Sequence, residues 1–289
     1  MMKEPIFTGA CTALVTPFLG DRINYPMLER LLERQMEGGI EAVVICGTTG
    51  EAPTLSDEEK LELFRRAKRY VGNRCKIIAG TGSNSTSHTV HLSMEAEQVG
   101  ADGLLVVTPY YNKANAEGLF AHYMAVCHRV SIPVMIYNVP SRTGVDIPVP
   151  VLKRLSVISN VAGIKEASSD ITKITKIRHA CTLPVYTGND DQITPVLSLG
   201  GMGVISVLSN VLPVQTQALC RAALDGDFDT AAALQIQLQP LVELLFSDVN
   251  PIPVKAAMEI IGYDCGEPRL PLIQASEEIQ RKLKSLLLQ

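Results

Sequence analysis

Short apolar runs rich in valine and isoleucine recur along the chain at intervals of roughly 30 residues. Each run is too short for a helix, and its composition suits a strand that is buried on both faces. There are eight such runs, at residues 10–17, 41–51, 76–82, 102–111, 133–140, 161–168, 184–190 and 201–209. The pattern therefore predicts eight strands of a parallel sheet.

Amphipathic stretches separate these runs. Residues 25–39 carry an apolar stripe and end at glycines, and residues 56–72 open with the capping-box pair Ser56 and Glu59. Residues 85–101 repeat the form. Eight strands alternating with helices predict an α/β fold, a (β/α)8 TIM barrel. A doubly wound open sheet fits less well, because it would usually have fewer strands and a phosphate-binding glycine fingerprint near the first one.

The strand pattern stops near residue 225. Three helical stretches follow, at residues 227–246, 252–262 and 276–289. No Gly/Ser-rich linker precedes them, so we expect a catalytic barrel over residues 1–225 and a C-terminal helical extension over 226–289 rather than a second independent domain.

Composition favours a small-molecule enzyme. The chain has 289 residues, 46% of them hydrophobic, and a net charge of −4 without any Lys/Arg run, which argues against a nucleic-acid partner. No 18-residue apolar stretch indicates a membrane span, and no apolar run near residue 1 suits a signal peptide. The seven cysteines are widely spaced without a CxxC pair, which fits neither a disulfide framework nor a zinc site. We expect a soluble cytoplasmic protein.

Polar side chains gather at the ends of the predicted strands, where the active sites of such barrels lie. Those that end or follow a strand are Thr16, Gly47 to Glu51, Thr108 to Tyr111, Tyr137, Asn138, Arg142, Lys165, Glu166, Gly188 to Asp190, and Ser206. If the strand assignments hold, all of them converge on one barrel mouth.

Lys165 is the most informative of these residues, because it directly follows the apolar run Val161 to Ile164. Partial burial lowers the pKa of a lysine, and a neutral amine in a semi-dry pocket can attack a ketone to form a Schiff base. The protonated imine then acidifies the adjacent carbon. The alternative is a rim lysine paired with Glu166, and strand placement alone leaves both readings open.

The residues at neighbouring strand ends favour the catalytic role for Lys165. Tyr137 ends the preceding strand, so its phenol could shuttle protons at an imine carbon. Thr48 and Thr49 lie in a glycine-flanked turn that can hold a small carboxylate, and the planar fork of Arg142 suits a second one. Each residue alone has a simple structural role, as rim packing, a tight turn or a surface charge. Their joint placement supports a site.

Three other patterns are weaker. His88 and His91 are three residues apart on a helix and could chelate a metal, but no third ligand accompanies them. Asp190 and Asp191 could bind a cation, although capping of the following helix is simpler. The glycines of residues 200–203 lack the rest of a dinucleotide fingerprint. We expect no metal and no bound cofactor.

The motifs GTTGE (47–51), TPYYN (108–112), YNVPSRTG (137–144), GIKEAS (163–168), GVISV (203–207) and NPIPVK (250–255) occur together. In this order and spacing the chain resembles the dihydrodipicolinate synthase family over nearly its whole length. That family belongs to the pyruvate-dependent class I aldolases, which include N-acetylneuraminate lyase. The resemblance implies condensation of pyruvate with L-aspartate 4-semialdehyde on the route to diaminopimelate and lysine, usually by a homotetramer built as a dimer of tight dimers.

The resemblance also implies residue roles. Lys165 would form the Schiff base, and Tyr137 would donate and accept protons. Thr48 would link Tyr137 in a proton relay to Tyr111, which reaches into the neighbouring subunit's site. Thr49 would hold the pyruvate carboxylate through its hydroxyl and backbone N–H. The remaining pocket residues are Arg142, for the semialdehyde carboxylate, and Gly188 and Ile205, through backbone groups.

Alternatives remain within and outside this class. An aldolase acting on a keto-deoxy sugar acid or N-acetylneuraminate would share the pyruvate half, but sialic acid lyases usually lack an arginine in the VPSRTG loop. A barrel that senses an oxo acid without turnover would be expected to lose the lysine or the tyrosine.

The effector positions of the family differ in this chain. Many members are inhibited by lysine at the tight-dimer interface, and Asn84 and Tyr110 are retained here. Asp57 and Lys60 stand where sensitive enzymes tend to carry histidines, and His88 stands in place of a glutamate that meets the effector's ammonium. The sequence predicts a vestigial effector site with weak or absent lysine inhibition.

Overall fold

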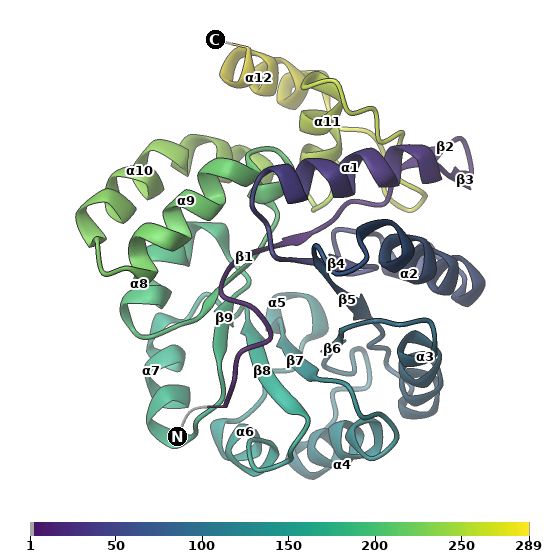
Figure 1. Cartoon of the computed structure of the whole chain (residues 1–289), viewed down its shortest axis with the longest axis vertical. Coiled ribbons are helices and arrows are strands. Elements are labelled where there is room, and N and C mark those ends of the chain that lie inside the picture. The colour runs from purple at the N-terminus through teal and green to yellow at the C-terminus, as the bar shows by residue number, and fades with distance from the viewer. Residues whose placement is uncertain (1–2, 289) are drawn as a thin grey trace.

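Eight parallel strands close into a barrel in the computed structural model, which describes residues 3–288 (Figure 1). Around the barrel the order is β1, β10, β9, β8, β7, β6, β5 and β4, and β4 pairs with β1 to close it. The strands are β1 (Gly9–Ala13), β4 (Ala42–Ile45), β5 (Lys76–Gly80), β6 (Gly103–Val107), β7 (Val134–Asn138), β8 (Val161–Glu166), β9 (Val185–Thr187) and β10 (Gly203–Ser206). The predicted TIM barrel is confirmed, with every strand inside a predicted apolar run or one residue from it.

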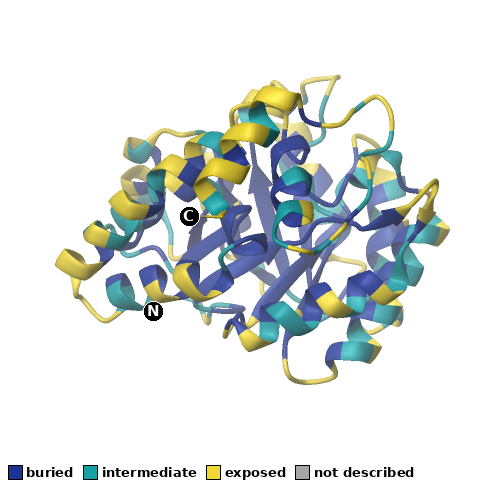
Figure 2. Ribbon diagram, turned by 90° about the horizontal axis from the view of Figure 1, so that it is seen from above, coloured by how far each residue is buried: buried dark blue, intermediate teal, exposed yellow. Residues whose placement is uncertain are grey.

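Helices surround this barrel and present exposed faces to solvent, whereas the strands at the centre are buried (Figure 2). The predicted capping box is present at the start of α2, where Ser56 accepts from the Glu59 backbone and the Glu59 carboxylate accepts from the Ser56 backbone. The helices of this layer are α1 (Tyr25–Glu37), α2 (Asp57–Val71), α3 (Thr86–Gln98), α4 (Ala116–Cys127), α6 (Val149–Leu155), α7 (Ile171–Ala180), α8 (Ile193–Ser198) and α9 (Pro213–Leu224). The short helix α5 (Pro140–Thr143) instead follows β7 at the barrel mouth.

Side chains of the strands alternate between two apolar layers. Ile136 and Ile164 belong to the large layer between strands and helices. Met135 and Tyr137 belong to a smaller cluster inside the barrel, together with Ile205 of β10. The last residues of the strands therefore carry alternate side chains into the barrel mouth or toward the helices.

The C-terminal helices are present as predicted. They are α10 (Phe228–Leu245), α11 (Ile252–Ile260) and α12 (Glu277–Leu287). In Figure 1, α10 runs beside α9, and α11 and α12 lie on the side of the molecule where α1 is found. The small β2 (Phe18–Leu19) and β3 (Arg22–Ile23) hairpin was not predicted, and the loop before α12 approaches it closely: a Cβ on Gly266 would lie 2.4 Å from the Phe18 carbonyl oxygen.

Candidate active site

Tyr137 and Lys165 are register partners at the carboxyl ends of β7 and β8. Both side chains are 6% exposed, and Nζ of Lys165 lies 4.3 Å from the centroid of the Tyr137 ring. The structure thus brings together the amine and the phenol that the sequence singled out. Because Lys165 is buried, its amine beside the ring is largely shielded from bulk water.

Gly188, directly after β9, makes room for the side chain of Lys165. A Cβ at this position would lie 2.8 Å from Cε of Lys165 and 2.7 Å from Cβ of Ala167. Such distances are shorter than real Cβ contacts allow, so only glycine leaves the Lys165 side chain where it is. Ile205 of β10 is fully buried in the same inner cluster as Tyr137.

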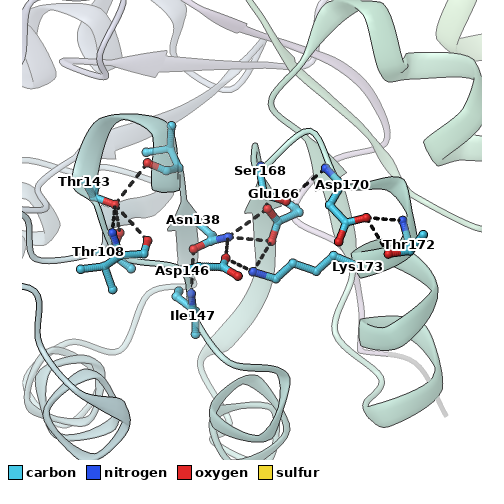
Figure 3. Close-up of polar contacts among 12 residues, drawn as sticks. Thr108, Asn138, Thr143, Asp146, Ile147, Glu166, Ser168, Asp170, Thr172 and Lys173 are labelled. Carbon is cyan, nitrogen blue, oxygen red and sulfur yellow. Dashed lines mark hydrogen bonds and ion pairs between the residues drawn. The ribbon is translucent and has the colours of Figure 1, made fainter.

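Glu166 is not the partner of Lys165. It is 3% exposed and faces the helix layer, where its carboxylate accepts from Nδ2 of Asn138 at 2.9 and 3.0 Å and from the backbone N–H of Ser168 at 2.8 Å. Its ionic partner is Lys173 of α7, whose Nζ is 3.5 Å away (Figure 3). The reading of Lys165 as a rim lysine paired with Glu166 is therefore wrong, because adjacent strand residues point to opposite faces.

A residue of the C-terminal extension is hydrogen-bonded to the GTTGE turn that follows β4. Asn250 donates from Nδ2 to Oγ1 of the buried Thr49 at 3.0 Å. Because Thr49 accepts this bond, its own hydroxyl hydrogen is free to donate to a ligand. The sequence did not single out Asn250 as a site residue; the only signal was its place in the NPIPVK motif.

An ion pair fixes the end of the same turn. Glu51 has left-handed backbone geometry with φ 56°, and its Oε1 lies 2.7 Å from Nζ of Lys255 on α11. Its Oε2 accepts from the backbone N–H of Arg269 at 2.8 Å. Both members of the pair are almost fully buried, and desolvation lowers the pKa of Lys255. A buried pair of this kind holds its segments in one arrangement, since either charge alone would be costly.

A cavity of about 660 Å³ opens at this mouth. Its lining includes Thr48, Tyr110, Tyr137, Arg142 and Thr143. Arg142 itself is exposed, at the C-terminal end of the short helix α5. The size is in the range of small-ligand sites.

The cavity continues toward the expected effector positions. Asp57, Lys60 and His88 line this part, and Nε2 of His88 lies 2.8 Å from the Asp57 carboxylate. Lys60 is 3.4 Å from the other oxygen of Asp57. Asn84 is exposed to solvent. The carboxylate at this place is thus already shared between two basic side chains.

Tyr111 stands apart from the other predicted residues. It is 86% exposed and has φ 74°, which is unusual for a non-glycine residue. Within the described part of the chain, the cavity is lined by Tyr110 but not by Tyr111.

The weaker candidates have structural roles. Asp190 does not cap the helix that follows it; its Oδ2 instead accepts from the backbone N–H groups of Val207 and Leu208, at 2.9 and 3.0 Å, where β10 ends. Desolvation raises the pKa of this fully buried carboxyl. No cluster of three potential metal ligands occurs among residues 3–288, and over the same range no helix is long and apolar enough to cross a bilayer.

The fold and the mouth residues define a (β/α)8 barrel with a buried amine–phenol pair at its mouth, whose tyrosine lines a small-ligand cavity. The sequence profile of the Dihydrodipicolinate synthetase family matches residues 6–289, and the chain belongs to this family.

Individual relatives agree over nearly their full lengths. The chain is 47% identical to the 4-hydroxy-tetrahydrodipicolinate synthase of Caldicellulosiruptor saccharolyticus over 98% of its own length and 97% of the relative. It is 45% identical to the enzyme of that name from Acetivibrio thermocellus, over 99% and 98%. The crystal structure of dihydrodipicolinate synthase from Aquifex aeolicus superposes with a TM-score of 0.96 at 42% identity, over 98% of this chain and 97% of that one.

Proposed function

We propose that this chain is a 4-hydroxy-tetrahydrodipicolinate synthase, which joins pyruvate to L-aspartate 4-semialdehyde in diaminopimelate and lysine biosynthesis. The observation that carries the proposal is the position of the Lys165 amine, 4.3 Å from the ring of Tyr137 at the mouth of the barrel. The full-length similarity to synthases of this name supports the choice of reaction.

Lys165 is the nucleophile in this proposal. Its neutral amine attacks the ketone carbon of pyruvate, and loss of one water gives a protonated imine. The imine withdraws electrons from the methyl carbon, which loses a proton and becomes an enamine. The enamine carbon then bonds to the aldehyde carbon of the semialdehyde, whose oxygen takes a proton. Attack by the amino group of the second substrate on the imine closes the ring and frees Lys165.

Tyr137 handles protons at this carbon, since its phenol belongs to the inner cluster and its ring centre lies 4.3 Å from the amine of Lys165. Thr48 lines the same cavity and would connect Tyr137 to Tyr111 of a second copy of the chain. The exposure of Tyr111 supports a role across a subunit boundary, because a side chain that leaves its own barrel is available to another. We therefore propose a homotetramer built as a dimer of tight dimers, in which the two subunits of each tight dimer complete each other's relay.

Thr49 would bind the pyruvate carboxylate with its hydroxyl and backbone N–H. The bond from Asn250 supports this role, since it leaves the Thr49 hydroxyl hydrogen free to point toward a ligand. Backbone groups of Gly188 and Ile205 complete the pocket on the side of Lys165.

Arg142 would bind the carboxylate of the semialdehyde. It lines the cavity with Tyr137, and its guanidinium can hold a carboxylate through two parallel hydrogen bonds. This residue also separates the proposal from its alternative, an aldolase for keto-deoxy sugar acids or N-acetylneuraminate, in which the pyruvate half of the site would be the same.

The proposed reaction needs no cofactor, because the imine itself supplies the electron sink. A cytoplasmic location fits the cysteines, all seven of which are unpaired thiols, six of them buried.

Borohydride trapping tests the proposal directly. Reduction in the presence of pyruvate should add one pyruvate-derived group to the protein, and peptide mapping should place it on Lys165. The Lys165→Arg variant should give no adduct, whereas Lys153→Arg, at an exposed position on α6, should trap normally. The untreated enzyme is then assayed with pyruvate and either aspartate semialdehyde or a sugar aldehyde. The aldehyde that is turned over faster identifies the second substrate. An adduct on another lysine, or preference for a sugar aldehyde, would overturn the assignment.

A further inference from the structure

Asn138 occupies the position directly after Tyr137, as Glu166 does after Lys165, and the two are register partners. Both are buried and face the helix layer, behind the proposed catalytic pair. The proposed mechanism uses neither of them. Figure 3 shows the amide of Asn138 between the carboxylates of Glu166 and Asp146, with the Lys173 side chain reaching them from α7.

Every polar group of the Asn138 side chain is engaged. Nδ2 donates to both oxygens of Glu166 and to Oδ1 of Asp146 at 2.8 Å. Oδ1 accepts from the backbone N–H of Ile147 at 3.0 Å. Lys173 is 5% exposed and forms ion pairs with both Asp146 and Glu166, so two carboxylates share one buried cation and one amide.

These bonds join two parts of the site. The bond to Glu166 fixes the ends of β7 and β8 against each other one residue after Tyr137 and Lys165. The bonds to Asp146 and Ile147 close the base of the segment 139–146, which contains α5 and Arg142. A single buried amide is therefore bonded both to the end of β8 beside the amine–phenol pair and to the base of the arginine loop.

We propose that Asn138 is a positioning residue that couples the Lys165–Tyr137 pair to the Arg142 loop, with Glu166 and Lys173 as its supports. This inference rests on the proposed function. Only an amide of this size supplies both donors and the acceptor: aspartate would place a third carboxylate beside Glu166 and Asp146, and an apolar residue would leave the Ile147 N–H and the Glu166 carboxylate without partners.

The pyruvate carboxylate site is held by different contacts. Thr49 is hydrogen-bonded to Asn250, and Glu51 is paired with Lys255. These contacts lie in a different part of the barrel mouth, and none of the four residues is bonded to Asn138. Disturbance of Asn138 should therefore lower kcat and should reduce kcat/KM for the semialdehyde more than kcat/KM for pyruvate, because only the former depends on both the Lys165–Tyr137 pair and Arg142.

The test is the Asn138→Asp variant of the full-length protein, checked by circular dichroism and thermal melting. We expect kcat/KM for aspartate semialdehyde to fall by about tenfold to a hundredfold, the effect of small displacements in a site, with a smaller fall for pyruvate. The double variant Asn138→Asp/Glu166→Gln exchanges the amide and the acid, and it should recover part of the loss, because the bond between positions 138 and 166 is restored while that to Asp146 is not. Asn138→Asp values within about twofold of the parent, or an equal fall for both substrates without recovery in the double variant, would overturn the inference.

A second pair of variants applies if Asn138→Asp fails to fold. Lys173→Met removes the shared cation at the outer end of the network, whereas Lys173→Arg retains it. The methionine variant should show the same unequal loss and the arginine variant should restore activity; equal behaviour of the two would contradict the proposal. The parent enzyme is assayed alongside: absence of parental turnover would remove the proposed function, whereas parental turnover with unaffected variants would remove only the role of Asn138.

Discussion

Tyr137 and Lys165 face each other as register partners on neighbouring parallel strands, with the amine 4.3 Å from the centre of the ring. Their separation is set by the strand spacing rather than by a flexible loop, so the pair is positioned before any substrate arrives.

The phenol of Tyr137 should be needed for turnover but not for the fold. Tyr137→Phe keeps the ring beside Lys165 and removes only the hydroxyl, so we expect kcat to fall by about 10²–10⁴-fold, the usual contribution of a proton shuttle. Steady-state kinetics measure the loss. Tyr186→Phe is the matched control, because the Tyr186 hydroxyl is bonded to the Phe7 carbonyl at 2.8 Å inside the same barrel. Equal losses in the two variants would argue against a proton-transfer role.

Gly188→Ala should impair imine formation. The new methyl group would collide with Cε of Lys165, and we expect the rate of borohydride-trappable adduct formation to fall by about tenfold or more. Gly118→Ala on α4 is the control, since its Cβ would meet neighbouring atoms at ordinary distances of 3.4 and 3.5 Å. Normal adduct formation in Gly188→Ala would mean that Lys165 does not depend on this space.

Lys255→Met should weaken both stability and pyruvate binding. It leaves the buried Glu51 carboxylate without its cation, and breaking such a pair costs about 3–5 kcal/mol of unfolding free energy. Because Glu51 ends the turn that carries Thr49, KM for pyruvate should rise. Denaturant unfolding and steady-state kinetics measure the two effects.

The double variant Glu51→Gln/Lys255→Met removes both charges and should recover part of the lost stability, because no isolated charge remains buried. Lys282→Met, which removes an exposed partner of Glu278, should change neither quantity measurably. A double variant as unstable as Lys255→Met alone would contradict the buried-pair argument.

His122 should make stability depend on pH in acid. Burial lowers the pKa of this histidine to about 4, and its Nδ1 is bonded to the Thr86 hydroxyl at 2.9 Å. The unfolded chain, with a histidine pKa of about 6.5, binds more protons between these values, so stability is lost as the pH falls from about 6.5 toward 4. The loss is about 1.6 kcal/mol between pH 6.5 and 5.

Urea unfolding of the parent and of His122→Gln at one protein concentration measures this contribution. The variant lacks the titrating group, so its stability should fall less over the same pH range. Parallel pH profiles for the two proteins would exclude His122 as the source.

Lysine should inhibit weakly or not at all. An effector ammonium entering the part of the cavity lined by Asp57, Lys60 and His88 would meet two basic side chains. The Asp57 carboxylate is already paired with both of them. Steady-state assays with increasing lysine test this, and half-inhibition at sub-millimolar lysine would contradict it. His88→Ala, which releases one partner of Asp57, gives a variant in which any residual affinity should increase.

The apolar periodicity and the residues at strand ends were enough to predict the barrel, the helical extension and the Lys165–Tyr137 pair. These features can be read locally, because the apolar composition of a strand indicates that it is buried on both faces. A parallel barrel then places the carboxyl ends of all its strands at one mouth. The two-residue hairpin strands were missed, since segments so short carry no period.

Contacts between distant segments were decided only by the tertiary structure. Asn250 is bonded to Thr49, 201 positions away in the sequence, and Lys255 is paired with Glu51. Glu166 forms its ion pair with Lys173 and not with its neighbour Lys165. No local pattern encodes such partners, because they depend on how the closed barrel turns alternate residues inward or outward and on where the C-terminal helices come to rest. The sequence by itself determined which groups could do the chemistry, and the packing of the folded chain determined what holds each of them in place.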